Sequence, residues 1–247
     1  MRAILTLTRL TLHESARRRI LLASLVCGGA FLLLFGLGLH FMRHQMSPRL
    51  LADTARYRGA MIVLTLAGLY AANFLTIMTA VLLPVDTLSG EIDSGVMQTL
   101  ASKPIRRAEI VLGKWLAYWL MTAVYLAIIA GGVVLVARYT MGFAQQHLVS
   151  AWPLMLLGAT FMLTISIAGS ARLKTVTNGI VAFGFYGIAF IGGWIEQIGA
   201  LTRNEVSRYV GTALSLVSPS DAMIWWALVL SAVALLFAVR VLERRSL

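Results

Sequence analysis

The chain carries little charge and almost no cysteine for its length. Only 13% of its 247 residues are Asp, Glu, Lys or Arg, whereas a soluble domain carries about twice that share. Apolar residues make up 59% of the sequence. The single cysteine, Cys27, excludes an internal disulfide framework, and we expect it to be a small packing residue. These shortages exclude an ordinary soluble domain and indicate a membrane protein.

Charge is missing above all from the long apolar runs that fill the sequence. Runs of about 20 apolar residues match the hydrocarbon thickness of a bilayer. Six can be placed, at residues 20–42, 60–83, 115–137, 152–171, 179–199 and 222–239. Only Glu196, near the end of the fifth run, comes close to placing a charge inside one, and this disfavours proton-coupled transport. The sequence predicts an all-α membrane protein with six transmembrane helices and one domain, 1–247.

Residue patterns for catalysis and metal binding are also missing. His13 and His147 lie in connections, and His40 and His44 lie at the end of the first run. An intramembrane serine protease needs a histidine facing a serine at membrane depth, and no His/Cys cluster has the spacing of a metal site. Gly113-Lys114 is not a phosphate-binding loop, because Ala and Trp stand at positions 108 and 115. We expect no catalytic, cofactor-binding or metal-binding residue, and therefore no enzyme.

Positive charge is unevenly distributed along the chain, and the distribution predicts a topology. The formal net charge is +11. With the N-terminus inside, 14 of the 21 Lys and Arg residues fall in inner connections and seven in outer ones, in agreement with the positive-inside rule. The basic balance therefore indicates topology and anionic-lipid contact rather than nucleic-acid binding. Four arginines of the first outer connection run against the rule, namely Arg43, Arg49, Arg56 and Arg58.

Residues 1–19 predict an amphipathic helix in the inner headgroup layer. Polar side chains share one helical face, at Arg2, Thr6, Arg9, His13 and Arg17. Apolar side chains cover the other side, at Ile4, Leu5, Leu7, Leu10 and Leu12. The alternative is a frayed basic tail. The apolar run that follows exceeds the roughly 7–15 residues of a signal-peptide core, so we expect an uncleaved membrane helix.

A second amphipathic stretch lies in the outer connection, residues 200–221. Its apolar residues follow helical spacing from Val206 to Val217, and Pro219 ends the stretch. A short helix in the outer leaflet and an ordinary surface loop explain this pattern equally well.

The polar side chains inside the apolar runs are few and uncharged. Asn73 and Thr76 lie in the second run, and Thr160 and Thr164 lie in the fourth. Such residues either line a translocation path or form hydrogen bonds between helices, and we favour hydrogen bonding between helices.

The longest charged stretch, residues 84–114, separates the second run from the third. It is formally neutral, because Asp86, Glu91, Asp93 and Glu109 balance Lys103, Arg106, Arg107 and Lys114. Val96, Met97 and Leu100 form an apolar face at helical spacing, and Pro104 ends the helical pattern. A short helix with one apolar side, held under the inner membrane surface, fits the groove of a partner protein.

The same stretch carries a family resemblance. The spacing Glu91-x3-Gly95-x4-Leu100-x3-Pro104-x2-Arg107-x5-Gly113-Lys114 resembles the signature of type II ABC exporter permeases, a group that includes the membrane subunit of NosDFY-like systems. The basic ending from Phe237 to Leu247 is similar to the ending of this group, although Ser246 replaces its acidic residue. The resemblance covers the whole helix layout.

The resemblance implies the permease subunit of an ATP-binding-cassette (ABC) exporter. Residues around 86–103 would form a cytoplasmic coupling helix that docks on a separate ATPase, within a coupling region of 84–114. Glu91 would make an electrostatic or capping contact, and Arg106 and Arg107 would meet the partner or lipid phosphates. The candidate docking residues are Asp86, Glu91, Asp93, Val96, Met97, Leu100, Arg106 and Arg107.

The resemblance also implies partners and a location. A dimer of ATPase subunits would bind ATP and Mg, and a second permease copy or a sister permease would complete the membrane part. An outer accessory protein is a further candidate partner. The chain would lie in a bacterial inner or plasma membrane with both termini in the cytoplasm. Low internal charge favours an apolar or amphipathic cargo. Two alternatives stay open: a non-transporting ABC-type module that transmits ATPase motion to an outer partner, and a membrane-embedded lipid enzyme.

Overall fold

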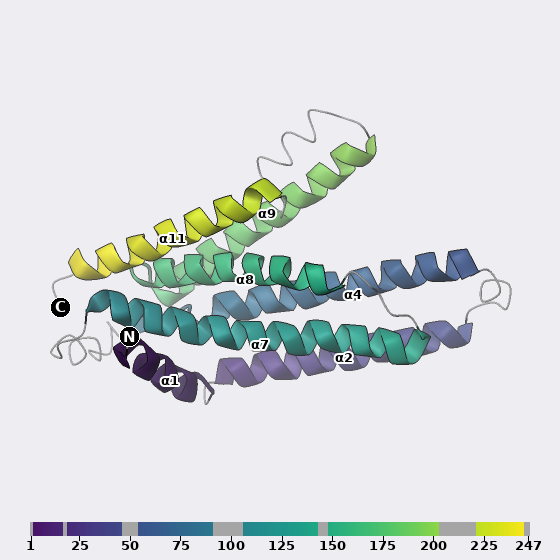
Figure 1. Cartoon of the computed structure of the whole chain (residues 1–247), viewed down its shortest axis with the longest axis horizontal. Coiled ribbons are helices and arrows are strands. Elements are labelled where there is room, and N and C mark those ends of the chain that lie inside the picture. The colour runs from purple at the N-terminus through teal and green to yellow at the C-terminus, as the bar shows by residue number, and fades with distance from the viewer. Residues whose placement is uncertain are drawn as a thin grey trace.

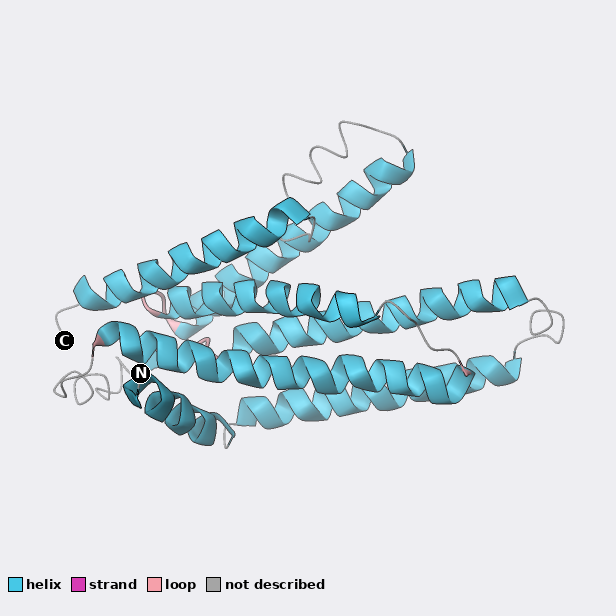
Figure 2. Ribbon diagram, in the orientation of Figure 1, coloured by secondary structure: helices cyan, strands magenta, loops and turns pink. Residues whose placement is uncertain are grey.

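A computed structural model describes residues 2–16, 19–45, 54–90, 106–142, 148–202 and 221–244 of the chain. Seven α-helices account for most of these residues: α1 (Arg2–Ala16), α2 (Arg19–Gln45), α4 (Thr54–Leu82), α7 (Arg107–Met141), α8 (Leu148–Ser170), α9 (Thr175–Thr202) and α11 (Asp221–Arg244). This part of the chain contains no strand (Figure 2). The predicted all-α class is therefore confirmed for the residues described.

The long helices form an elongated bundle whose members run in alternating directions. α2, α4, α7 and α8 lie alongside one another, α11 packs against α8 and α7, and α9 leans away from the others (Figure 1). α1 lies obliquely across one end, against α7. The end of α4, the start of α7, the α8–α9 connection and the end of α11 gather at the same end (Figure 1). We call it the α1 end.

The predicted membrane runs coincide with helices. Five helices are long and apolar enough to cross a membrane, judged by length and composition, within Arg19–Gln45, Tyr57–Leu82, Arg107–Thr140, Ala151–Ser170 and Thr175–Ile195. The sixth predicted run, 222–239, lies inside α11. α7 begins about two turns before the third run, so Gly113 and Lys114 are helical rather than part of a loop.

Large apolar side chains cover the outside of the bundle, while small and hydroxyl-bearing ones lie between helices. Leu33 is 70% exposed and Ile180 is 67% exposed, whereas Thr164 and Ser166 are completely buried. An apolar exterior of this kind is unfavourable in water and is solvated by lipid tails. Small and hydroxyl residues at the contacts let helix backbones approach closely.

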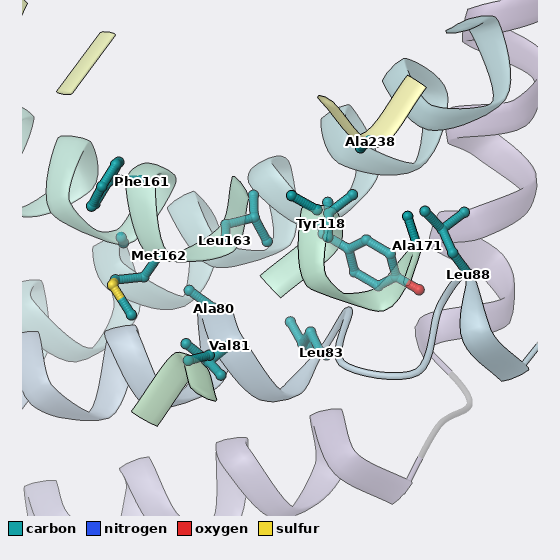
Figure 3. Close-up of a cluster of buried hydrophobic side chains, with 14 of the residues drawn as sticks. Ala80, Val81, Leu83, Leu88, Tyr118, Phe161, Met162, Leu163, Ala171 and Ala238 are labelled. Carbon is teal, nitrogen blue, oxygen red and sulfur yellow. The ribbon is translucent and has the colours of Figure 1, made fainter. Parts of the chain in front are cut away.

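The largest buried cluster draws its side chains from α4, α7, α8, α9 and α11. Figure 3 shows its part around Tyr118, with Leu83 and Leu88 from the segment after α4. Fully buried alanines contribute to it from four helices, at Ala80, Ala159, Ala182 and Ala238. This cluster holds the helices together beside the segment that forms the candidate site.

We expect Ala80→Phe to lower the unfolding temperature of the detergent-solubilised protein clearly. Ala80 has no exposed surface, and extra volume in a packed interior costs about 1–3 kcal/mol. Leu34→Phe is the control, because Leu34 is exposed and its replacement enlarges a side chain that meets detergent or lipid. Equal unfolding temperatures for the two variants would contradict the close packing of other helices against Ala80 in α4.

Candidate functional site

The candidate site begins where α4 ends. The chain leaves the helix after Leu82 and turns through Leu83–Leu88, a segment called here the post-α4 turn. Pro84 has no backbone N–H with which to continue the helical ladder, and the N–H of Thr87 donates to the carbonyl of Pro84 at 3.0 Å. The first residues of the predicted docking stretch therefore lie buried among the helices, with Leu83 and Leu88 beside Tyr118 (Figure 3).

Two side chains one turn apart on α7 hold the middle of the post-α4 turn. The hydroxyl of Thr87 donates to the hydroxyl oxygen of Tyr118 at 2.8 Å, and Lys114 Nζ lies 3.5 Å from the Thr87 carbonyl oxygen. Lys114 is only 4% exposed. A buried ammonium group is costly unless oxygen atoms face it, and the carbonyl groups of a non-helical turn need donors. The Lys114 ammonium group therefore gains an oxygen partner, and the turn gains a hydrogen-bond donor.

α8 and α9 hold both sides of the same turn. The hydroxyl of Ser166 in α8 donates to the Val81 carbonyl at 2.8 Å. The side-chain amide of Asn178 in α9 donates to the Val85 carbonyl at 3.0 Å and to the Ser166 carbonyl at 2.8 Å. The last carbonyl groups of a helix lack intrahelical partners, and these contacts supply donors for them. Three helices besides α4 thus fix the start of the connection.

α1 is fastened to α7 where α7 has no side chain. A Cβ atom added at Gly113 would lie 2.8 Å from the Cβ of Leu7 and 3.2 Å from the Ile4 carbonyl oxygen. The hydroxyl of Thr8 donates to the Gly113 carbonyl at 3.0 Å. Gly113 therefore permits close contact of the two backbones, and Lys114, its neighbour, reaches the post-α4 turn.

The buried face of α1 differs from the predicted apolar face. Leu7 is buried with Thr8, Thr11 and Ser15, whereas Leu5 and Leu10 are exposed. A stripe of small hydroxyl residues faces the protein, because hydroxyl groups can bond to nearby backbone carbonyls and allow a close approach. The helix at 2–16 is as predicted, but its leucines do not share one environment.

The arginines at the start of α7 lie at a junction with α11. Arg107 Nη1 donates to the carbonyl groups of Leu242 and of Glu243, the second at 3.2 Å. A cation is stabilised at the carbonyl end of a helix. Arg106 is exposed, and its N–H donates to the Glu109 carboxylate at 3.3 Å, which caps the first turn of α7. The link from Arg107 to α11 was not foreseen from the sequence.

Of the other predicted docking residues, only Asp86 lies within the part of the chain that the structure describes. Asp86 lies half-buried in the post-α4 turn. Glu91, Asp93, Val96, Met97 and Leu100 lie outside the described residues, as does most of the predicted outer helix at 200–221. The docking role of these residues stays a prediction.

The polar residues predicted inside the spans form contacts between or within helices. The indole N–H of Trp119 donates to Thr160 Oγ1 at 2.9 Å, and that of Trp115 donates to Thr164 Oγ1 at 3.0 Å, which joins α7 to α8. Thr76 donates to the Ala72 carbonyl of its own helix. Asn73 Oδ1 is buried and has no hydrogen-bond partner within the described part of the chain. A role of these residues in translocation stays a prediction.

The contacts of the site join helices to one another. Within the residues described, no three His, Cys, Asp or Glu side chains are grouped to hold a metal ion. Sequence analysis missed Asn178, which comes just before the fifth predicted run and therefore escaped the survey of polar residues inside spans. The sequence signal that could have indicated it is an asparagine at the edge of an apolar run, four residues after Lys174.

We expect Gly113→Ala to loosen α1. Alanine is a better helix former than glycine by about 1 kcal/mol, but its Cβ would overlap Leu7. Hydrogen exchange of amides 4–15 should therefore become faster. Gly158→Ala in α8 is the matched control, because a Cβ there meets nothing within 4 Å, and this variant should keep the exchange of α1 unchanged. Unchanged exchange in both variants would contradict the α1–α7 contact.

A comparison with family models finds a match over most of the chain. The model of the ABC-2 family transporter protein matches residues 13–235, which is most of the chain. A search of the curated proteins finds no match. The matched range includes the end of α1, five complete helices and nearly all of the candidate site. The chain therefore belongs to the ABC-2 family of transporter proteins, as a multi-pass membrane subunit.

Proposed function

We propose that the chain is the permease subunit of a type II ABC exporter, similar to the membrane subunit of NosDFY-like systems. ATP hydrolysis by a separate ATPase subunit would drive movement of a substrate across the membrane. Family membership supports the transporter subunit. One observation carries the coupling role: the segment that leads into residues 91–105 is anchored to α7, α8 and α9 by side chains.

Residues 91–105 join two fixed points at the α1 end. On one side lies the buried post-α4 turn, and on the other lies the capped start of α7 at Arg106. A pull on this segment therefore acts on α4 and α7 through the chain itself. It reaches α8 and α9 through Ser166 and Asn178, and α11 through Arg107. Docking of an ATPase dimer on residues 86–103 would use these links.

The distribution of cations supports a cytoplasmic α1 end. Arg107, Lys114, Arg172, Lys174 and Arg240 belong to helix ends or connections that gather there. The positive-inside rule places such an end in the cytoplasm. At the opposite end, Arg43 donates to the Thr140 carbonyl in the last turn of α7, and a structural role of this kind accounts for one of the discordant outer arginines. Both termini would then be cytoplasmic in a bacterial inner or plasma membrane.

The proposed assembly contains two permeases and two ATPase subunits. Counting α11 as the sixth span, the chain supplies half of the twelve spans that such exporters use, so a second copy of this chain is the proposed partner. ATP and Mg would bind to the ATPase subunits. The cargo would be apolar or amphipathic, because the predicted spans carry almost no charge.

We expect Glu91→Arg and Leu100→Asp to weaken association with the ATPase. The first reverses a charge and the second places a carboxylate on the proposed apolar docking face. Affinity purification of the tagged chain from its native membranes, followed by measurement of bound ATPase protein and ATP hydrolysis, tests this.

Arg58→Glu is the matched control, because Arg58 is exposed at the opposite end of α4, where a charge reversal should leave association unchanged. Full association and unchanged ATP hydrolysis in both docking variants would show that residues 86–103 do not carry the contact. Absence of any ATPase from the purified wild-type protein would contradict the proposed function itself.

The proposed topology is tested with single cysteines in a Cys27→Ala background. Arg106 and Tyr139 are exposed near opposite ends of α7, and Leu247 follows α11. In intact cells a membrane-impermeant maleimide should label Tyr139→Cys. Arg106→Cys and Leu247→Cys should react only after permeabilisation. Labelling of Leu247→Cys in intact cells would mean that α11 does not return the chain to the cytoplasm.

A further inference from the structure

Asn178 occupies an unusual position for an uncharged polar residue. It lies in the first turn of α9 and is 1% exposed. Its Nδ2 atom donates to two carbonyl oxygens on different segments, Val85 after α4 and Ser166 in α8. A side-chain amide has two N–H groups on one nitrogen, and both are used here. One side chain thus joins α8, α9 and the post-α4 turn.

The surrounding chain leaves room for this amide. A Cβ atom at Gly169 would lie 2.0 Å from Asn178 Oδ1, closer than any side chain tolerates. The Gly169 carbonyl also accepts the N–H groups of Arg172 at 3.0 Å and Leu173 at 2.8 Å, which closes the short connection between α8 and α9. Gly169 therefore both shapes this α8–α9 hairpin and seats the amide that fastens it.

The attachment resists separation because its acceptors are buried. Val85 is in the post-α4 turn, outside a helix, and no other hydrogen bond to its carbonyl is found within the described residues. Leaving a buried carbonyl without a donor is costly, because it loses its bond to water and gains no other. The hairpin and the post-α4 turn are therefore expected to move together rather than slide past each other.

We infer that Asn178 is a positioning residue that transmits movement of the post-α4 turn to the α8–α9 hairpin. This inference rests on the proposed function, in which an ATPase pulls on the segment after the turn. α4 and α7 receive that pull through the chain, but α9 is connected to it only through side chains. These are Asn178, which donates to the Val85 carbonyl at 3.0 Å, and a longer contact of 3.4 Å between the hydroxyls of Ser89 and Thr175. α9 also leans away from α4 toward the far end of the bundle (Figure 1). A small displacement held at Asn178 therefore becomes a larger displacement at the far end of α9.

The attachment itself is tested on the full-length chain alone in lipid vesicles. We expect Asn178→Ala to speed hydrogen exchange in residues 83–90 by about tenfold, since a buried carbonyl of this segment loses its donor. Asn178→Leu keeps the side-chain volume and should give the same result if the alanine variant does not fold. Unchanged exchange in a folded variant would overturn the attachment.

Tyr125→Phe is the matched control. It removes a hydrogen bond of 3.1 Å from Tyr125 to the Ser24 carbonyl, which joins α7 to α2, and a contact with the Thr79 side chain inside α4. Neither contact reaches the residues of the post-α4 turn. Its exchange in residues 83–90 should equal that of the wild type. An equal increase in Tyr125→Phe would mean that general loosening, and not the loss of the Asn178 contact, explains the result.

Transmission is tested on the complex with its ATPase, using an environment-sensitive fluorophore on a single cysteine in the Cys27→Ala background. The two probe positions are Val63 in α4 and Trp194 in α9, which are both exposed. ATP should change the emission at both positions in the otherwise wild-type complex. With Asn178→Ala, ATP should still change the emission at Val63→Cys, and the change at Trp194→Cys should be much smaller, because only the longer Ser89–Thr175 contact then remains. ATPase association should be retained.

The outcomes separate this inference from the proposed function. A full ATP-dependent change at Trp194→Cys in the Asn178→Ala complex would overturn the transmission role, even if this complex is less stable than the wild type. Loss of the change at both positions, with ATPase still bound, would also overturn it, because a general defect would then explain the result. A wild-type chain that binds no ATPase would contradict the proposed function and with it the transmission role, while hydrogen exchange would still decide the attachment.

Discussion

Backbone groups that leave a helix inside a membrane bundle must find partners within the protein, because lipid offers none. The post-α4 turn is where this constraint is strongest in the described chain. The carbonyls of Val81, Val85 and Thr87 receive donors from Ser166, Asn178 and Lys114, which belong to three different helices. The need to satisfy one irregular segment thus draws α7, α8 and α9 to the end of α4. The elements at the α1 end are arranged around that meeting point.

Two glycines are as important to this meeting point of helices as the polar side chains are. At Gly113 the absence of a Cβ lets α1 lie against α7, and at Gly169 it makes room for the Asn178 amide. Lys114, next to Gly113, reaches the post-α4 turn, so α1 and the turn meet neighbouring residues of α7. A pull applied between Gly90 and Arg106 would therefore meet a stiff support rather than loose helix ends. Such a support suits a transporter subunit whose energy comes from another chain.

The spans were predictable because a bilayer imposes one strong requirement on each of them. About 20 apolar residues without charge indicate a membrane helix whatever their neighbours are, and the first five runs lie within helices that fit this description. Contacts between helices follow no such local rule. Leu5, Leu7 and Leu10 look alike in the sequence, yet only Leu7 packs against α7. Arg107 belongs to a charged stretch that suggested an outside partner, but its guanidinium meets the end of α11, 135 residues further along the chain.

The all-α class, the positions of the membrane helices, the lack of a recognisable catalytic motif and the family resemblance all follow from the amino-acid sequence alone. Each of these depends on composition or on spacing within a short window, where local periodicity reports the surroundings directly. Which polar groups meet, in contrast, depends on how the helices pack. Asn178 and Val85 are 93 residues apart in the sequence, so no pattern within a short window can reveal their contact. Their contact exists because α8 and α9 fold back as a hairpin against the end of α4, and hydrogen bonding in a buried site depends on that placement.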